Sequence, residues 1–186
     1  MLFRSIIPAN SNLSLSEINL RDELGGERTL SELLEPLCCD YESIICDTNP
    51  YLGLLSINAL AACNSVIIPV SPQLWSATGL TDLLQTIHKI KRKINPSIEI
   101  EGILMTMCDE RTRLFRDTKA LLDDYCTGNL RIFNTRIPHT VRVGEANYAS
   151  ASIIDFDAKC SAAIAYTQFA KEVMAHAGSR KANASA

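Results

Sequence analysis

The sequence predicts an α/β fold in which a largely parallel sheet is flanked by helices. Short apolar runs alternate along the chain with amphipathic stretches of helical length, which is the pattern of βαβ units. Apolar residues make up 47% of the 186 residues and charged residues 21%, values typical of a globular protein with a buried core. No internal repeat or linker interrupts the pattern, so we expect a single domain.

Five strands are expected at short apolar runs that alternate with the helical segments. The run at 43–47 (SIICD) ends in an acid, and the run at 65–70 (SVIIPV) follows it after an apolar segment of helical length at 52–63. Strand, helix and strand in this order favour a parallel pair. In chain order, the expected strands are residues 3–8, 43–47, 65–70, 98–107 and 131–137.

The helices are expected from capping signals and from apolar residues at helical spacing. Ser14 with Glu17, and Thr29 with Glu32, are capping-box pairs that each predict the start of a helix. A later helix is expected to end in the basic residues of 89–93 (KIKRK). The apolar faces that mark helices are formed by Leu30, Leu33, Leu34 and Leu37; by Leu80, Leu83, Leu84, Ile87 and Ile90; by Leu114, Phe115, Leu121, Leu122 and Tyr125; and by Tyr166, Phe169, Ala170, Val173 and Met174.

Composition disfavours several classes of protein. No run approaches the roughly 18 apolar residues of a membrane span, and residues 1–11 lack the basic flank and apolar core of a secretion signal, so a cytoplasmic protein is expected. The seven cysteines include no CxxC pair, which disfavours a disulfide-stapled domain and a cysteine-based metal site. Residues 178–186 are small and polar, which predicts a short tail after a folded region of residues 1–177.

Charge is distributed unevenly along the chain. Residues 1–60 hold nine acids and three bases, whereas residues 61–186 hold twelve acids and fifteen bases. Residues 111–142 alone carry seven bases and three acids. A basic second half suits an anionic partner, and an ordinary solvated surface is the alternative.

Asp47 is a candidate ligand-binding residue because it stands at the carboxyl end of an expected strand. In open parallel sheets, ligands bind beyond these ends. A carboxylate held there suits a Mg²⁺ ion or its water, since Mg²⁺ prefers hard oxygen ligands. The alternative is an ordinary acid in the turn after a strand.

The charged residues at 109–113 (DERTR) stand between an expected strand and an expected helix. Arginines near a helix N-terminus oppose the macrodipole, which favours negative charge there. A phosphate would resolve this conflict, because guanidinium groups and free helix N–H groups both bind anions. The alternative is an ion pair with Asp109 or Glu110. Arg142 follows the next strand end and is expected on the same side of the sheet.

Four segments of the sequence are informative when taken together: 47–60 (DTNPYLGLLSINAL), 67–84 (IIPVSPQLWSATGLTDLL), 95–113 (NPSIEIEGILMTMCDERTR) and 137–146 (IPHTVRVGEA). They resemble segments of the ParA/Soj family of partition ATPases. They occur in the family's order and at its spacing, within a match that runs from about residue 3 to residue 176. The resemblance implies an AAA-type P-loop NTPase fold over residues 1–177. It also implies a dimeric, Mg-ATP-dependent protein that binds DNA non-specifically and is switched by a ParB-type partner during plasmid or chromosome partition.

The resemblance implies roles for individual residues. Asp47 matches the Walker B acid, which in the family helps to hold Mg²⁺ through water. Gly53 matches the segment after Walker B that responds to nucleotide. Arg111 and Arg142 match arginines with which the family grips the DNA backbone. The family's adenine pocket corresponds to Thr106, Met107, Asp109 and Pro138.

One departure from the family concerns the phosphate loop. Neither GxxxxGK[ST] nor KGGxGKT occurs in the sequence, and the only adjacent glycines, Gly25 and Gly26, are followed by Glu27 and Arg28. The resemblance therefore implies a ParA-like fold that is truncated at its N-terminus and lacks the P-loop strand. Because phosphoryl transfer depends on positioning by that loop, we expect the chain to be deficient in hydrolysis. The strand would lie beside residues 43–47, so we also expect poor solubility or pairing with another chain.

Two function hypotheses follow. The first is the body of a ParA-like partition protein, with ATP and Mg²⁺ as the family's cofactors and with DNA, a ParB-type protein and a second ParA chain as partners. It is expected in the cytoplasm, on the nucleoid if it binds DNA. No membrane role is expected, because residues 178–182 lack the apolar face of an amphipathic anchor. The alternative is a non-enzymatic regulatory module that binds DNA or full-length ParA, or a decayed gene fragment; ATP binding distinguishes the two.

Overall fold

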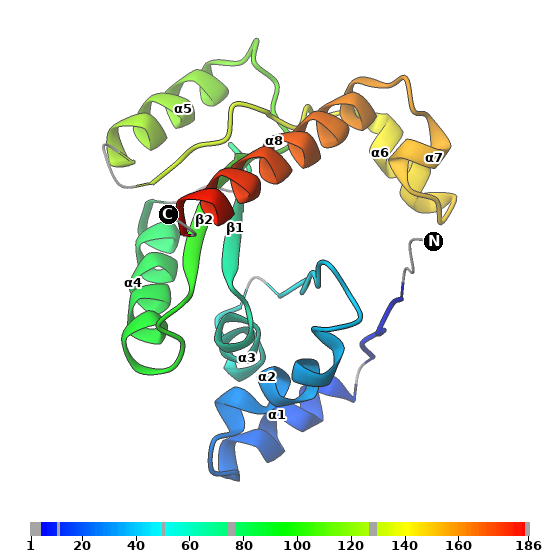
Figure 1. The fold of residues 1–186 in the computed structure, drawn as a ribbon. Helices are drawn as coiled ribbons and strands as arrows, with labels where there is room; N and C mark the ends of the chain where they lie inside the picture. Colours follow the sequence, from blue (N-terminus) through cyan, green and yellow to red (C-terminus); the bar gives the residue numbers. More distant parts are fainter. Residues whose placement is uncertain (1–4, 11, 50, 74–76, 127–129, 185–186) are drawn as a thin grey trace. The chain divides into compact units, whose positions relative to one another are not determined.

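The structure is a computed structural model that describes residues 5–10, 12–49, 51–73, 77–126 and 130–184 (Figure 1). Contacts divide the chain into two compact units. The first contains the chain up to Val66 together with Thr78–Glu99, and the second contains Ile67–Ala77 and the chain from Ile100 onward. In chain order, the elements are α1 (Leu13–Asp22), η1 (Gly26–Arg28), α2 (Thr29–Leu34), η2 (Glu35–Leu37), α3 (Leu54–Ala62), β1 (Ser65–Val70), α4 (Ala77–Lys93), β2 (Glu99–Met105), α5 (Arg113–Tyr125), α6 (Val141–Tyr148), α7 (Ile153–Phe156) and α8 (Ser161–Ala184).

β1 and β2 form a parallel pair. Glu99 N donates to Asn64 O over 3.0 Å, and Thr106 N donates to Val70 O over 2.8 Å, so the two strands run in the same direction. Residues 131–138 continue the parallel arrangement through two bridges to the β2 segment, Ile103–Ile132 and Cys108–Pro138. These pairings confirm an α/β fold with a small parallel sheet flanked by helices.

Three of the five expected strands are wrong as continuous strands. Residues 43–47 form no strand. In the first expected strand, residues 5–8 form no strand either, and residues 3 and 4 lie outside the described part of the chain. Residues 131–137 make bridges only. A strand persists where a neighbour satisfies its N–H and C=O groups, and no strand among the described residues pairs with 43–47. The apolar composition of that segment is therefore not sufficient to make it a strand.

The capping-box predictions identify two helices but assign the wrong caps. α1 begins at Leu13, one residue before Ser14, and Glu17 accepts a hydrogen bond from Leu54 N over 2.6 Å. Leu54 is the first residue of α3, so Glu17 satisfies an N–H group of a different helix. Thr29 is itself the first residue of α2, and its hydroxyl donates to Gly26 O over 3.2 Å.

The second half of the chain contains more helix than the sequence predicts. α6 and α7 have no counterpart in the sequence prediction, because neither is long enough to show an apolar period. α8 runs to Ala184 and so includes most of the segment expected to be a polar tail. No helix in the described residues is long and apolar enough to cross a membrane.

The core of the second unit lies between β2 and α8, which Figure 1 shows beside each other. Leu104 packs with Ala165, and the ring of Phe133 meets that of Phe169 edge to face, with centroids 4.9 Å apart. Gly102 makes room for this packing, because a Cβ there would lie 2.9 Å from Phe133 Cε2. The core thus fixes residues 131–138 against β2, and it thereby positions the two loops that leave this side of the sheet.

The adjacent glycines of the first unit form a tight turn between helices. Gly25 has φ +78°, which favours glycine, and a Cβ on Gly26 would lie 2.0 Å from Leu20 O. The buried Asn58 of α3 holds the turn: its Nδ2 donates to Gly26 O over 2.7 Å, and its Oδ1 accepts from Leu30 N over 3.0 Å. The glycine pair therefore serves chain packing.

Candidate functional site

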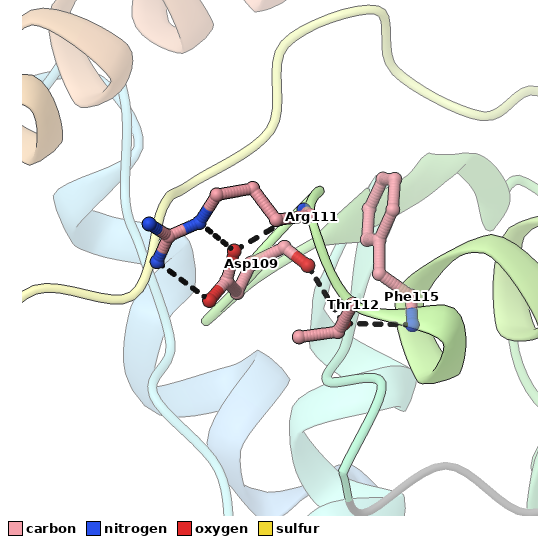
Figure 2. A network of polar contacts seen from close by, with 4 residues as sticks. All are labelled: Asp109, Arg111, Thr112 and Phe115. Carbon is pink, nitrogen blue, oxygen red and sulfur yellow. Dashed lines mark hydrogen bonds and ion pairs between the residues drawn. The ribbon is translucent and has the colours of Figure 1, made fainter.

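A network of polar contacts stands at the start of α5, where Asp109, Arg111, Thr112 and Phe115 meet (Figure 2). Thr112 is the N-cap residue: its Oγ1 accepts from Phe115 N over 3.2 Å and donates to Asp109 O over 2.7 Å. Arg111 Nε and Nη2 donate to Asp109 Oδ1 and Oδ2 over 2.9 and 3.0 Å. Arg111 is therefore held by a bidentate ion pair directly before the helix.

The Arg111 side chain remains 90% exposed despite this pair. The hydrogen bonds from Arg111 hold the pKa of Asp109 below its ordinary value, and the same contacts raise the pKa of Arg111. Asp109 thus stays charged at neutral pH and occupies two of the five guanidinium N–H groups. The remaining N–H groups of Arg111 have no recorded partner among the described residues, so they are available to a ligand from solvent.

Arg142 has a similar environment at the start of α6. Thr140 caps this helix by accepting from Arg142 N over 3.2 Å. Arg142 Nη1 lies 2.9 Å from Glu145 Oε2, and Nε lies 3.5 Å from Asp157 Oδ2. The hydrogen bond to Glu145 is the largest cause of the raised pKa of Arg142. Half of the side chain is exposed, so the guanidinium is both paired and accessible.

The two arginines follow the ends of neighbouring parallel segments. The bridge between Cys108 and Pro138 is the last pairing on this side of the sheet, and His139 N still donates to Cys108 O over 2.9 Å. Arg111 comes three residues after Cys108, and Arg142 four residues after Pro138. Since parallel strands end at one edge, the topology brings both arginines to the same edge of the second unit, as expected.

Carboxylates resolve the conflict between these arginines and the helix dipoles. The alternative stated for Arg111, a pair with Asp109, is the arrangement observed, while Glu110 pairs with Arg136 over 2.7 Å. The helix-dipole argument therefore does not by itself require a bound anion. Sequence reasoning missed the partners of Arg142: Glu145 is signalled by its spacing of three residues in a helix, but nothing in the sequence signals Asp157.

Asp47 and Gly53 both lie in the first unit. Asp47 is exposed and follows a segment without regular structure, so it is not fixed by a strand as predicted. Gly53 is the N-cap residue of α3, and a Cβ there would lie 2.3 Å from Glu17 Oε1. The contact between Glu17 and α3 therefore gives Gly53 a packing role that is separate from any ligand.

The expected adenine-pocket residues lie together in the second unit. Thr106 continues the pairing to β1, and Met107 has φ +51°, a left-handed backbone conformation that is uncommon for residues other than glycine. Cys108 and Pro138 contribute to an open recess, and burial raises the pKa of the Cys108 thiol to about 11. Thr106, Met107 and Asp109 are not among the residues that line this recess. The lining residues are Cys108, Glu110, Arg136, Pro138, Ser161, Ile164, Ala165 and Gln168.

The described residues do not fit a complete Mg-ATP site. They contain no group of three or more His, Cys, Asp and Glu side chains that could hold a metal ion. Asp47 is the one candidate ligand, and its exposed, irregular segment does not hold a carboxylate in a fixed position. The best-formed candidate site in the described chain is therefore the pair of exposed arginines.

Known proteins resemble this chain over most of its length. Residues 1–100 match a protein-family model described as an AAA domain. The chromosome-partitioning ATPase Soj of Treponema pallidum is 36% identical over 174 residues, which cover 94% of this chain and 68% of that protein. The sporulation initiation inhibitor protein Soj of Bacillus subtilis is 37% identical over 175 residues, which cover 92% of this chain and 67% of that protein.

A solved structure agrees with these relatives. Cobyrinic acid a,c-diamide synthase from Mycobacterium smegmatis, with bound ADP and magnesium, matches with a TM-score of 0.75 at 31% identity, over 92% of this chain and 62% of that one. The chain spans from about half to about two thirds of the length of the curated relatives it matches. The family model, the two Soj proteins and the structural match point the same way, and this chain belongs to the ParA/Soj family of ATPases.

Proposed function

We propose that this chain is a DNA-partitioning protein of the ParA/Soj type that binds DNA without sequence preference through Arg111 and Arg142. The observation that carries the proposal is the exposure of both guanidinium groups at one edge of the second unit. Guanidinium groups bind phosphate oxygens with two N–H groups at once, and contacts to phosphates carry no sequence information. Similarity to a chromosome-partitioning ATPase supports DNA as the anionic partner.

The carboxylates beside the arginines set the strength of this binding. Asp109 accepts hydrogen bonds from Nε and Nη2 of Arg111, a pair of nitrogens that could bind a phosphate together. Glu145 accepts a hydrogen bond from Nη1 of Arg142. A phosphate must displace these carboxylates or bind to the remaining N–H groups. We therefore propose that each arginine exchanges between its carboxylate and DNA, and that such binding is weak and strongly dependent on salt.

The residues present in this chain bear differently on nucleotide binding and on hydrolysis. ATP and Mg²⁺ are expected from the family, and ADP with magnesium is bound in the Mycobacterium smegmatis enzyme. In this chain we propose that hydrolysis is deficient, because the sequence contains no GxxxxGK[ST] segment. We further propose a cytoplasmic location on the nucleoid and a ParB-type protein or a second ParA chain as protein partners, on the strength of family membership.

The test is to measure the affinity of the full chain for a random-sequence DNA duplex over a series of salt concentrations. Changing Arg111→Ala and Arg142→Ala together should weaken binding equally for different sequences. It should also flatten the slope of log affinity against log salt by about 2, since each phosphate contact contributes about 0.9. Changing Asp109→Asn should have the opposite effect on affinity, because it removes the charge that competes with phosphate for Arg111.

The matched control is Arg21→Ala with Lys171→Ala, which removes two positive charges from the exposed surfaces of α1 and α8. This control should reduce the slope much less than the arginine pair does. Equal losses in the two double variants would show that only net charge matters. An unchanged affinity after loss of both Arg111 and Arg142 would contradict their role as phosphate contacts.

A further inference from the structure

A second group of positive charges lies in the first unit, at the C-terminal turns of α4. Lys89, Lys91, Arg92 and Lys93, named here the α4 basic cluster, are all exposed. Lys89, Arg92 and Lys93 are spaced at i, i+3 and i+4, so they share one helix face. The buried residues Leu84, Ile87 and Ile90 define the opposite face of α4, which packs into the core.

The α4 basic cluster brings together cations that have no carboxylate partner among the described residues. Arg21, Arg116, Lys159 and Lys171 also form no ion pair there, but each of these stands apart from the others along the chain. Arg111, Arg113, Lys119, Arg131, Arg136 and Arg142 each form an ion pair with an Asp or Glu. Within the described ranges, none of the four residues of the cluster forms such a pair. The one acid of α4, Asp82, is seven residues before Lys89, about 10 Å along the helix axis at 1.5 Å per residue.

The C-terminal end of α4 is also capped without using the cluster. Arg28 of η1 donates from Nη2 to Ile94 O over 3.1 Å, and Asn95 N donates to Ile90 O over 2.9 Å. The buried Asn95 side chain holds this end against α3 by donating to Leu60 O and Cys63 O. A helix dipole favours cations here, but like charges three and four residues apart repel one another. Three cations on one face, none paired with a carboxylate in the described ranges, therefore exceed what the helix end requires.

We propose that the α4 basic cluster is a second binding surface for the phosphate backbone of DNA, one that rests on the proposed DNA-binding function and extends it to the first unit. Its cations bind phosphate without first giving up a carboxylate, whereas Arg111 and Arg142 must share theirs. The cluster therefore contributes more to the salt dependence of DNA binding than the two arginines do. A membrane surface fits less well, because the apolar face of α4 is buried.

The experiment uses the full chain and random-sequence duplex DNA. Lys89→Gln, Arg92→Gln and Lys93→Gln together should weaken binding at low salt by at least about tenfold and flatten the salt slope by about 2.7, at 0.9 per lost contact. Arg92→Gln alone should flatten it by about 0.9, which keeps the test valid if the triple variant fails to fold. The control, Arg21→Gln, Lys119→Gln and Lys171→Gln, removes the same charge from α1, α5 and α8 and should change the slope little.

Each outcome decides a different point. If wild type binds DNA and the triple variant binds with the same affinity and slope, the α4 surface is overturned while the proposed function stands. If wild type binds no DNA at any salt concentration, the proposed function fails and the α4 proposal fails with it. If the triple variant loses affinity for polyglutamate but keeps its affinity for DNA, the cluster binds an acidic protein segment, and the DNA proposal is overturned.

Discussion

Glu172 on α8 organises residues 131–135, which follow α5 and lead towards Arg142. Its carboxylate accepts from Asn134 N over 2.9 Å, from Thr135 N over 3.0 Å and from Arg131 Nη2 over 3.0 Å. Only 14% of the Glu172 side chain is exposed. Burial acts to raise the pKa of Glu172, but the hydrogen bonds from Asn134, Thr135 and Arg131 outweigh it, and the pKa is lowered. The charged form is therefore the one that stabilises the fold.

The sign of this shift predicts acid sensitivity. A carboxyl group whose pKa is lower in the folded state stabilises the protein above its unfolded pKa, near 4.5, and loses that contribution as pH falls through the folded pKa. Glu172→Gln should cost about 1–3 kcal/mol at neutral pH, because the Asn134 and Thr135 N–H groups and Arg131 lose a charged acceptor. Urea unfolding at neutral pH and below pH 4.5 measures both effects.

The control for Glu172 is Glu32→Gln in α2, an acid on a helix for which no such set of donors is recorded. It should leave stability nearly unchanged at both pH values. The cost of Glu172→Gln should shrink in acid, where the wild-type carboxyl is also protonated. A cost that stays the same at low pH would show that shape, and not charge, makes Glu172 important.

At the scale of elements, β2 and α4 could be predicted from the sequence because their burial follows a local period. β2 was expected at 98–107 and spans Glu99–Met105, and the predicted apolar stripe of α4 includes the buried Leu80, Leu84, Ile87 and Ile90. The roles of Glu17 and Gly102 depend on contacts with residues 37 and 31 positions away, which no local pattern contains. The same limit applies to the candidate site: the sequence places Arg111 before a helix and Arg142 after a strand end, but it signals neither α6 nor the Asp157 partner of Arg142.

The segment 43–47 leads to a prediction about association. Ile45 is 92% exposed and Ile44 is also exposed, although their composition suits a strand. Unpaired N–H and C=O groups beside exposed apolar side chains favour pairing with another chain. We expect wild type to associate as its concentration rises in sedimentation velocity. Ile45→Lys should reduce this association, since a lysine on an unpaired segment disfavours edge-to-edge contact.

The control for Ile45 is Ile154→Lys on α7, which places the same charge on an exposed isoleucine of the other unit. It should leave association close to the wild-type level. A wild-type protein that sediments as one monomeric species at every concentration would contradict the prediction, and it would show that exposed residues 43–47 are tolerated in isolation.

At the scale of the whole molecule, the net charge is −3, but two local surfaces are rich in positive charge. One is the arginine edge of the second unit, where cations are paired with carboxylates. The other is the α4 basic cluster of the first unit, whose cations have no carboxylate partner among the described residues. Long-range repulsion from an acidic protein weakens DNA binding as salt falls, while contacts with phosphates strengthen it. An affinity that rises as salt falls would therefore show that the contacts of these local surfaces with phosphates outweigh the repulsion from the net charge.

The lack of a phosphate-loop motif in this sequence bears on both ATP hydrolysis and the effect of ATP on DNA binding. Phosphoryl transfer requires backbone N–H groups, a lysine and a held Mg²⁺ around the phosphates. The sequence has no phosphate loop, and Asp47 stands exposed in an irregular segment. We therefore expect phosphate release from Mg-ATP by the purified chain, with or without DNA, to equal that of the Asp47→Asn variant and of a blank without protein. DNA affinity should also be independent of ATP. Phosphate release well above the blank that disappears in Asp47→Asn would contradict the proposed deficiency, because it would require Asp47 to act in a complete site.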